Sequence, residues 1–249
     1  MSAVDQEARI AAARERLIFA VDVPDASKAV WYATHLAKEV GFFKVGLELF
    51  TAAGPQVVRD LVKHDARVFL DLKLHDIPAT VGRTVTGLAE LGVSLITVHA
   101  AGGGAMIEAA AQAAKKADQP PKILAVSALT SLDGEDLKAT GVDLGMRDLV
   151  VKRAALARDR GADGVVTSVQ EAAAVRFIAP EPFLVVTPGI RPAGADAADQ
   201  KRTGTPAAAV EAGASHLVVG RPIRDAADPV AAARGIVEQM AEALPEHLV

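Results

Sequence analysis

Short apolar runs rich in Val, Ile, Leu and Phe recur along the 249-residue chain, and each is followed by a longer stretch with helical character. The early runs begin roughly 25 residues apart, which is the length of a strand–helix unit rather than of a solenoid repeat. We therefore predict helices between the runs, for example over 52–64, 105–117 and 147–161. The predicted strands are 17–22, 42–46, 67–72, 94–99, 122–127, 163–167, 183–187 and 215–219.

Eight strands alternating with helices in a chain of this length predict an α/β fold, a (β/α)₈ TIM barrel in a single domain. A doubly wound open sheet is the alternative, but it would normally carry G-x-G-x-x-G after the first strand. Here the first strand is followed by Val23-Pro24-Asp25, and Gly102-Gly103-Gly104 after the fourth is interpreted as a tight turn. We assign 17–249 to the barrel, 1–16 to an N-terminal helix or loose arm, and 130–145 to an elaborated loop.

Composition narrows the classes of function. The net charge is −4 without a Lys/Arg block, which argues against nucleic-acid binding as a main role. The chain has no cysteine, so disulfides, thiolate catalysis and Cys-based zinc sites are excluded. Charges in the first 16 residues leave no apolar core long enough for a signal peptide, so we expect none, and we see no apolar run long enough to span a membrane. We expect a cytoplasmic protein.

Polar residues gather where the predicted strands end, which is where TIM barrels build their active sites. They are Asp22, Lys44, Asp71, Lys73, Asp76, His99, Ser127, Thr130, Arg191, Gly220 and Arg221. Side chains alternate along a strand, so Asp71 and Lys73 should face the same side. An inward Asp–Lys pair is costly to desolvate unless it is partnered, which makes it a functional candidate. The alternative is a structural ion pair that caps the core.

Several segments resemble a known family. The run FLDLKLHDIPATVG (69–82) resembles the signature of orotidine 5'-monophosphate decarboxylase, whose core is Asp-x-Lys-x-x-Asp-Ile-Pro. Related phosphosugar barrels share Asp-x-Lys-x-x-Asp, so Ile77-Pro78, Lys44 and two arginine loops make the resemblance specific. Further similar segments are IFAVD (18–22), FFKVGLELF (42–50), VHAAGG (98–103), SALTS (127–131), TPGIRP (187–192), DQKR (199–202) and VVGRPI (218–223).

The resemblance implies a cofactor-free, metal-free homodimer that converts orotidine 5'-monophosphate to uridine 5'-monophosphate in pyrimidine biosynthesis. Lys73 would be the proton donor, in a charge array with Asp71, Lys44 and an Asp76 supplied by the neighbouring subunit. The remaining implied roles are Asp22 and Lys44 at the ribose hydroxyls, Thr130 near the pyrimidine, Arg191, Gln200 and Arg221 at the phosphate, and Ile77 and Thr80 lining the site from across the dimer.

These residue types suit the reaction. Loss of CO₂ from C6 leaves electron density on a carbon without a conjugated sink, so the protein must stabilise a localised carbanion electrostatically. A lysine supplies the positive charge and a proton, whereas an arginine is effectively never deprotonated. Two carboxylates would hold that ammonium in place.

The two predicted loops after the seventh and eighth strands suit a phosphate. TIM barrels often bind phosphate there, Gly189 and Gly220 allow close backbone approach, and Arg191 and Arg221 offer bidentate donors. A solvated surface charge is the alternative for each arginine. The polar loop 192–204 is interpreted as a closing lid with Gln200 as its latch, or else as a surface connection.

Other functions remain open. A hexulose-phosphate synthase or keto-gulonate-phosphate decarboxylase would use the same core with Mg²⁺, but would need an acidic residue where this chain has Lys44. A phosphate-ligand binding protein without activity would have no need of the Asp–Lys–Asp array. The chain has no G-x-S-x-G elbow, which disfavours a Ser-His-Asp hydrolase. His99 is interpreted as structural, and His75 receives no catalytic role.

Overall fold

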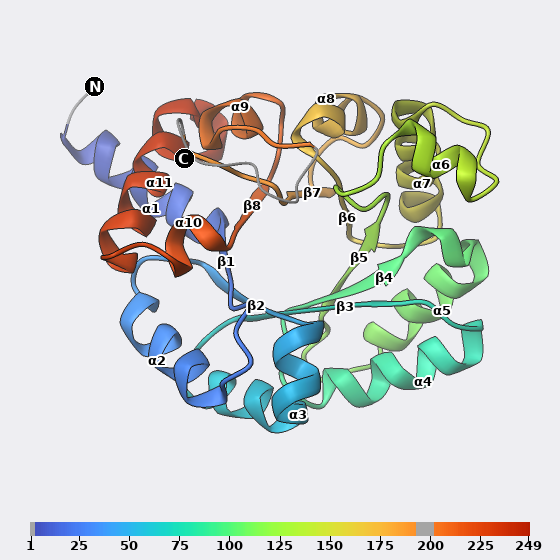
Figure 1. Ribbon diagram of the computed structural model, residues 1–249, viewed down its shortest axis with the longest axis horizontal. Helices are drawn as coiled ribbons and strands as arrows, with labels where there is room; N and C mark the ends of the chain where they lie inside the picture. The colour runs from blue at the N-terminus through green and yellow to red at the C-terminus, as the bar shows by residue number, and fades with distance from the viewer. Residues whose placement is uncertain (1–2, 193–201) are drawn as a thin grey trace.

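The computed structural model describes residues 3–192 and 202–249. Over these residues the chain forms a closed barrel of eight parallel strands, each paired with its sequence neighbours, and β8 paired with β1 (Figure 1). The predicted TIM barrel is therefore confirmed. The strands are β1 (Leu17–Ala20), β2 (Phe42–Gly46), β3 (Val68–Leu74), β4 (Leu95–His99), β5 (Lys122–Val126), β6 (Gly164–Val166), β7 (Leu184–Thr187) and β8 (His216–Val219).

Helices surround the barrel and cover the outer face of the sheet (Figure 1). They are α1 (Ala3–Arg16), α2 (Ala26–Leu36), α3 (Leu47–Lys63), α4 (Pro78–Ala89), α5 (Gly104–Ala114), α6 (Gly134–Ala139), α7 (Met146–Asp159), α8 (Val169–Ile178), α9 (Pro206–Glu211), α10 (Arg221–Arg224) and α11 (Pro229–Ala243), with 3₁₀ turns η1 (Ala100–Gly102) and η2 (Glu246–Leu248). Helix α3 is kinked at Gly54, which has a φ of 66° and directly precedes Pro55. None of the described helices is both long and apolar enough to cross a membrane.

Most strand residues are apolar because both faces of the sheet are buried. In β1, Leu17 and Phe19 belong to the core between sheet and helices, and Phe19 packs on Tyr32 of α2 with ring centroids 5.0 Å apart. The alternate residues Ile18 and Ala20 point into the barrel instead. The barrel interior is filled by Ile18, Ala20, Phe42, Phe69, Leu95, Leu124, Val186 and Val218.

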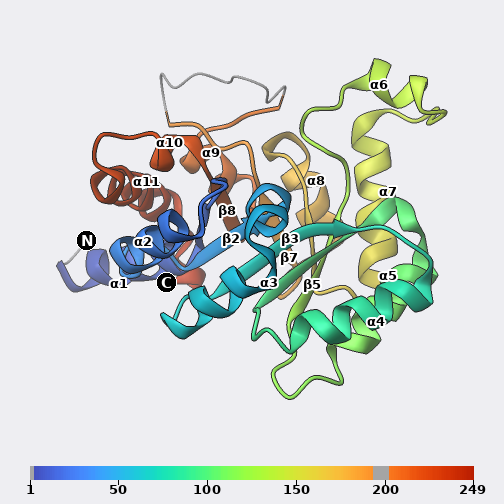
Figure 2. The same ribbon diagram turned by 60° about the horizontal axis from the view of Figure 1, so that its bottom comes forward.

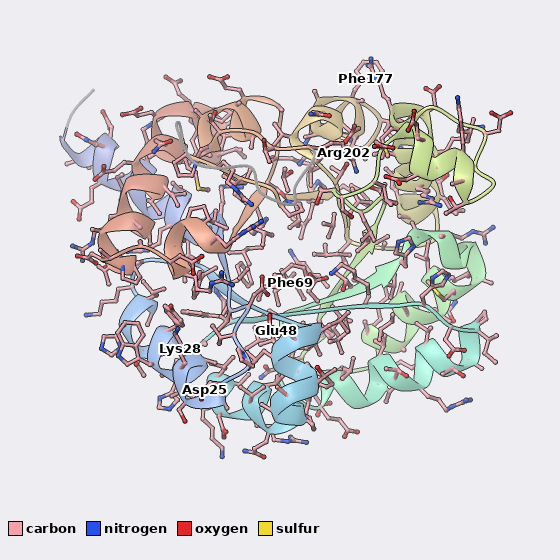
Figure 3. The ribbon with its side chains drawn as sticks, viewed as in Figure 1. Asp25, Lys28, Glu48, Phe69, Phe177 and Arg202 are labelled. Atoms are coloured by element: carbon pink, nitrogen blue, oxygen red, sulfur yellow. The ribbon has the colours of Figure 1, made fainter. Side chains whose placement is uncertain are left out.

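Phe69 shows what this interior layer contributes. Its side chain is 1% exposed and lies near the centre of the barrel (Figure 3). Burial of a side chain of this size stabilises the fold by about 1.5–3 kcal/mol. The layer closes the barrel below its C-terminal mouth, so groups two residues further along each strand stand on an apolar floor.

Two segments outside the barrel strands can be compared with the sequence prediction, which gave a loop over 130–145 and a helix or loose arm over 1–16. The segment predicted as an elaborated loop contains the short helix α6, which lies at the same end of the molecule as α10 (Figure 2). Asp133 caps α6, accepting hydrogen bonds from the backbone N–H groups of Glu135 and Asp136, so the helix begins there. At the N-terminus, α1 packs against α11, and Arg9 donates to the backbone carbonyl of Ala241 at 3.0 Å.

Candidate active site

A cavity of about 820 Å³ opens at the C-terminal end of the barrel strands. Eight of the residues that the sequence singled out line it together: Asp22, Lys44, Asp71, Lys73, Thr130, Arg191, Gly220 and Arg221. They come from the ends of β1, β2, β3 and β8 and from the loops after β5 and β7. Residues that lie far apart in the chain thus form one site, as the barrel topology requires.

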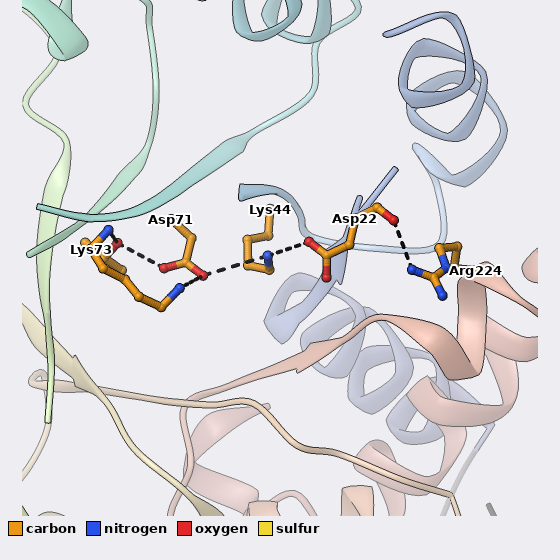
Figure 4. A network of polar contacts seen from close by, with 6 residues as sticks. Asp22, Lys44, Asp71, Lys73 and Arg224 are labelled. Atoms are coloured by element: carbon orange, nitrogen blue, oxygen red, sulfur yellow. Dashed lines mark hydrogen bonds and ion pairs between the residues drawn. The ribbon is translucent and has the colours of Figure 1, made fainter. Parts of the chain in front are cut away.

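Four charged side chains of alternating sign run across the floor of this cavity (Figure 4). The Nζ atom of Lys44 lies 2.9 Å from Oδ1 of Asp22 and 3.7 Å from Oδ2 of Asp71. That same Oδ2 of Asp71 accepts a hydrogen bond of 2.9 Å from Nζ of Lys73. The order is therefore Asp22, Lys44, Asp71, Lys73, and each inner charge lies between two charges of opposite sign.

Strand alternation places three of these four groups. Asp22, Lys44 and Asp71 each lie two residues beyond an inward apolar residue, namely Ala20, Phe42 and Phe69. Because side chains alternate with a period of two, all three must point inward, one layer above the apolar floor. The array is thus a polar layer built on the core packing of the barrel.

Lys73 reaches the cavity by a different route. Regular pairing of β3 with β4 is interrupted between Leu70 and Leu74, and Lys73 has a φ of 51°, in the left-handed region. Such a backbone costs on the order of 1–3 kcal/mol for a residue other than glycine. Its backbone N–H donates to Oγ1 of Thr97 at 2.8 Å, which holds the irregular conformation. Lys73 and Asp71 do line one cavity, as predicted, but the irregular backbone of β3 sets the direction in which the Lys73 side chain points.

Asp71 is the electrostatic centre of the array. Burial opposes its ionisation, but the ammonium groups of Lys44 and Lys73 and hydrogen bonds from Lys73 and Thr97 outweigh it, so the pKa of Asp71 lies below its ordinary value. The hydroxyl of Thr97 donates to Oδ1 of Asp71 at 3.0 Å. Asp71 is therefore a carboxylate at neutral pH and keeps the ammonium of Lys73 in place.

Two arginines line the cavity where β7 and β8 end. Arg191 follows β7 and Arg221 begins α10 directly after β8, so two adjacent strands bring both arginines to the same side of the cavity. Gly189 has a φ of 77°, which favours glycine at this turn. The backbone N–H of Arg191 donates to the carbonyl of Gly204 at 2.9 Å, so the two ends of the loop after β7 lie side by side. This cationic end suits an anionic group such as a phosphate.

Three predicted site residues do not line the cavity of their own chain: Asp76, Ile77 and Thr80. Asp76 lies past the end of β3 and is exposed, and its Oδ1 accepts from the backbone N–H of Ile77 at 2.6 Å. Ile77, 66% exposed, is the residue before α4, and Thr80 lies in the first turn of that helix. Gln200 falls outside the described residues.

The two histidines near the motif pack against each other. His75 stacks on His99 with ring centroids 5.2 Å apart, and neither ring lines the cavity. Burial, with the nearby charges of His75 and Arg153, lowers the pKa of His99 to about 4. Nδ1 of His99 accepts a hydrogen bond from the backbone N–H of Ala101 at 3.2 Å. The described residues contain no group of three His, Asp or Glu side chains arranged to hold a metal ion.

Several residues that shape the site were missed from the sequence. Thr97 orders both Asp71 and Lys73, and its position two residues beyond the inward Leu95 was the available signal. A Cβ atom on Gly46 would lie 2.9 Å from Nζ of Lys44 and 3.3 Å from Oδ1 of Asp22, so a larger residue there would displace this ion pair. Arg224 also lines the cavity, and its Nη1 donates to the backbone carbonyl of Asp22 at 2.9 Å (Figure 4).

Comparison with known proteins assigns the chain. The model of the orotidine 5'-phosphate decarboxylase / HUMPS family matches residues 15–236, which include every described residue that lines the cavity. The chain belongs to this family. Membership confirms the resemblance that the segment 69–82 indicated.

Individual relatives agree over nearly their whole length. The orotidine 5'-phosphate decarboxylase of Trichlorobacter lovleyi is 48% identical over 92% of this chain and 96% of its own. The one from Moorella thermoacetica is also 48% identical, over 92% of this chain and 93% of its own. In structure, the orotidine 5'-phosphate decarboxylase of Lactobacillus acidophilus superimposes with a TM-score of 0.78 at 39% identity, covering 90% of this chain and 98% of that one.

Proposed function

We propose that this chain decarboxylates orotidine 5'-monophosphate to uridine 5'-monophosphate in pyrimidine biosynthesis. One observation carries the proposal: the alternating Asp22–Lys44–Asp71–Lys73 array stands in a cavity whose far end carries Arg191 and Arg221. A pyrimidine nucleotide has a matching layout, with the reacting carbon at one end and a phosphate dianion at the other. Relatives that share nearly half of the sequence bear the name of this activity.

The reacting carbon would lie against Lys73. The bond between C6 and the carboxylate breaks, CO₂ leaves, and the electron pair stays on C6. The ammonium of Lys73 stabilises that pair and then donates its proton to C6, which gives the product. Asp71, hydrogen-bonded to the ammonium at 2.9 Å, orients it and would receive no proton itself.

The same carboxylate also acts on the substrate. Asp71 is buried and ionised, so a substrate carboxylate bound about 4 Å away would be repelled by roughly 4 kcal/mol at an effective dielectric constant of 20. Departure of CO₂ relieves that repulsion. Contacts remote from C6 must offset it in the bound substrate, and the phosphate end is their source.

The remaining groups would bind the nucleotide. We assign the ribose hydroxyls to Asp22 and Lys44, which are held together at 2.9 Å. The loop after β5 carries Thr130 beside the pyrimidine. Arg191 and Arg221 would take the phosphate, with the backbone at Gly220 beside them and Gln200 as a further ligand.

We infer that the active site is completed across a homodimer. Asp76, Ile77 and Thr80 lie beyond the end of β3 and do not line the cavity of their own chain, and Ile77 exposes 66% of its surface. In a two-fold dimer each subunit would give these residues to its partner and receive the partner's copies. Asp76 of the partner subunit would then be the second carboxylate beside Lys73.

The alternative function, that of a hexulose-phosphate synthase or keto-gulonate-phosphate decarboxylase, needs a divalent metal ion. An Mg²⁺-dependent enzyme would require an acidic ligand at position 44, whereas here an ammonium lies between two carboxylates. That ammonium occupies the place where a metal ion would neutralise Asp22 and Asp71. The charge pattern therefore favours the metal-independent decarboxylation.

A direct assay tests the proposal. Purified protein in EDTA should consume orotidine 5'-monophosphate, followed as the loss of its ultraviolet absorbance, with uridine 5'-monophosphate confirmed by chromatography. Readdition of Mg²⁺ should leave the rate unchanged. A protein that is inactive until Mg²⁺ is added, or that is inactive throughout, would contradict the assignment.

A further inference from the structure

A buried ion pair lies outside the cavity and has no part in the chemistry described above. Arg202 and Glu171 are 7% and 5% exposed, and Nη1 of Arg202 lies 2.7 Å from Oε2 of Glu171. The hydroxyl of Ser168 donates to the same carboxylate. Arg202 lies close to helix α8, on the inner side of the helical ring (Figure 3). Neither charged side chain lines the cavity.

This guanidinium joins two loops at the mouth of the barrel to the first turn of α8. Its Nη1 contacts Glu171 in α8, which follows β6. Its Nη2 donates to the backbone carbonyl of Leu129 at 2.8 Å, in the loop after β5 that also carries Thr130. Arg202 itself belongs to the connection after β7.

The link extends to the cationic end of the cavity through the backbone. Gly204, two residues beyond Arg202, accepts from the N–H of Arg191 at 2.9 Å and forms an isolated bridge with Ile190. The loop that holds Thr130 and the loop that holds Arg191 are therefore connected through one side chain. These two loops face opposite ends of a nucleotide in the proposed binding mode.

Stability alone does not account for this pair. Burying two charges costs several kcal/mol per ion, and apolar residues of similar volume often serve as well or better. The Nε atom of Arg202 is moreover buried without a hydrogen-bond partner among the described residues. What an apolar pair could not supply is the fixed geometry of a planar guanidinium that bonds Glu171 and Leu129 at once.

We infer that Arg202, held by Glu171, is a positioning residue that sets the spacing between the base-binding loop after β5 and the phosphate-binding loop after β7. The inference rests on the proposed function, because it assigns those two loops to the two ends of the substrate. Phosphate binding can assist the reaction only if both ends are held at a fixed separation. Without Arg202, the phosphate still binds but contributes less to placing the pyrimidine.

The test compares two substrates in the full-length protein. The double variant Arg202→Met/Glu171→Met removes both buried charges, so neither is left unpaired. Its kcat/KM is measured with orotidine 5'-monophosphate and with the nucleoside orotidine, which lacks the phosphate. We expect a loss of about 100-fold for the nucleotide, the effect of misplacing reacting groups by about 1 Å, and of less than about tenfold for the nucleoside.

A control for the loss of an ion pair uses Arg234 of α11 with Glu39, which are bonded at 2.7 Å and do not line the cavity. Arg234→Met/Glu39→Met should leave both kcat/KM values and their ratio unchanged. If the Arg202 double variant does not fold, Arg202→Lys replaces it. That ammonium keeps the contact with Glu171 but lacks the planar fork, so the ratio should again fall, by a smaller factor.

The outcomes separate the inference from the proposed function. An equal loss for both substrates would mean that the pair is merely structural, and an unchanged nucleotide rate would mean that it positions nothing; either result overturns the inference. A wild-type protein without activity on orotidine 5'-monophosphate would instead contradict the proposed function. A selective loss of the advantage of the nucleotide over the nucleoside supports the positioning role.

Discussion

The N-terminal end of the barrel strands, opposite the active site, holds a histidine whose protonation should affect stability. His216 begins β8 and points into the barrel, two residues before the inward Val218, with its ring 5.5 Å from that of Phe42. Burial, with the positive charges of Arg16, Lys122 and Arg67 around it, lowers the pKa of His216 from 6.5 to about 3. Arg16 ends α1, Lys122 begins β5 and Arg67 directly precedes β3, so protonated His216 would meet like charge from three segments.

The size of the effect follows from this pKa. Between pH 6.5 and about 3, the unfolded chain binds a proton that folded His216 does not bind. The free energy of unfolding is therefore highest above pH 6.5 and falls as the pH drops. Integration from pH 8 to pH 5 gives a loss of about 2 kcal/mol from this residue. Because part of the residue reaches solvent, we expect about 1–2 kcal/mol.

Substitution with an uncharged residue isolates this contribution. His216→Gln removes the titration and keeps a polar group for Ser215, whose hydroxyl oxygen lies 3.2 Å from Nδ1 of the histidine. At pH 8 the variant should be less stable than the wild type by about 1 kcal/mol, because the ring contact with Phe42 is lost. At pH 5 the two proteins should be equally stable, or the variant more so.

Urea unfolding at pH 8, 6 and 5, at one protein concentration, measures these differences. His64→Gln, at an exposed position after α3, is the matched control and should follow the wild type at every pH. The reasoning is refuted if His216→Gln and the wild type differ by the same amount at all three pH values. In that case the histidine would titrate alike in the folded and unfolded chains.

Three further predictions concern the active site. Lys73→Ala should lower turnover by more than the 10²–10⁴-fold that is typical of a lost proton donor, because a cation is lost as well. Lys73→Arg should also be nearly inactive. If either variant kept a tenth of wild-type turnover, the role assigned to Lys73 would be excluded. Arg221→Ala should weaken both nucleotide binding and turnover. In the wild-type protein, added phosphite should accelerate the reaction of the truncated nucleoside, which lacks the phosphate. If the nucleoside reacts as fast as the nucleotide, the phosphate site is misassigned. Mixed and reassociated Lys73→Ala and Asp76→Ala subunits should regain roughly a quarter of wild-type activity, because half of the dimers are heterodimers with one intact site. Absence of recovery, with heterodimers verified by native mass spectrometry, would exclude a shared site.

Part of this structure could be predicted because it depends on local periodicity. The alternation of buried strands with helices predicted the closed barrel, and each predicted strand overlaps one in the structure. Strand ends then indicated where polar side chains would converge, and Asp22, Lys44 and Asp71 do meet there. A period of two along a strand is a property of the backbone itself, so it can be read from the sequence alone.

Other parts depend on contacts between segments that are distant in the chain. The positive φ of Lys73 relies on the hydroxyl of Thr97 in the next strand, and no local pattern around Lys73 signals it. The buried pair of Arg202 with Glu171 joins residues 31 positions apart. Each partner read alone is an ordinary charged residue in a polar segment.

The sequence by itself determined the fold class and the chemical identity of the charges at the barrel mouth, because both follow from residue type and short-range spacing. Only the tertiary structure decided the order of those charges, the direction of the Lys73 side chain and the link that Arg202 makes between loops. The physical reason is that electrostatic and hydrogen-bond energies depend on distances of a few ångströms between groups. Those distances are set by closure of the whole barrel, when β8 pairs with β1.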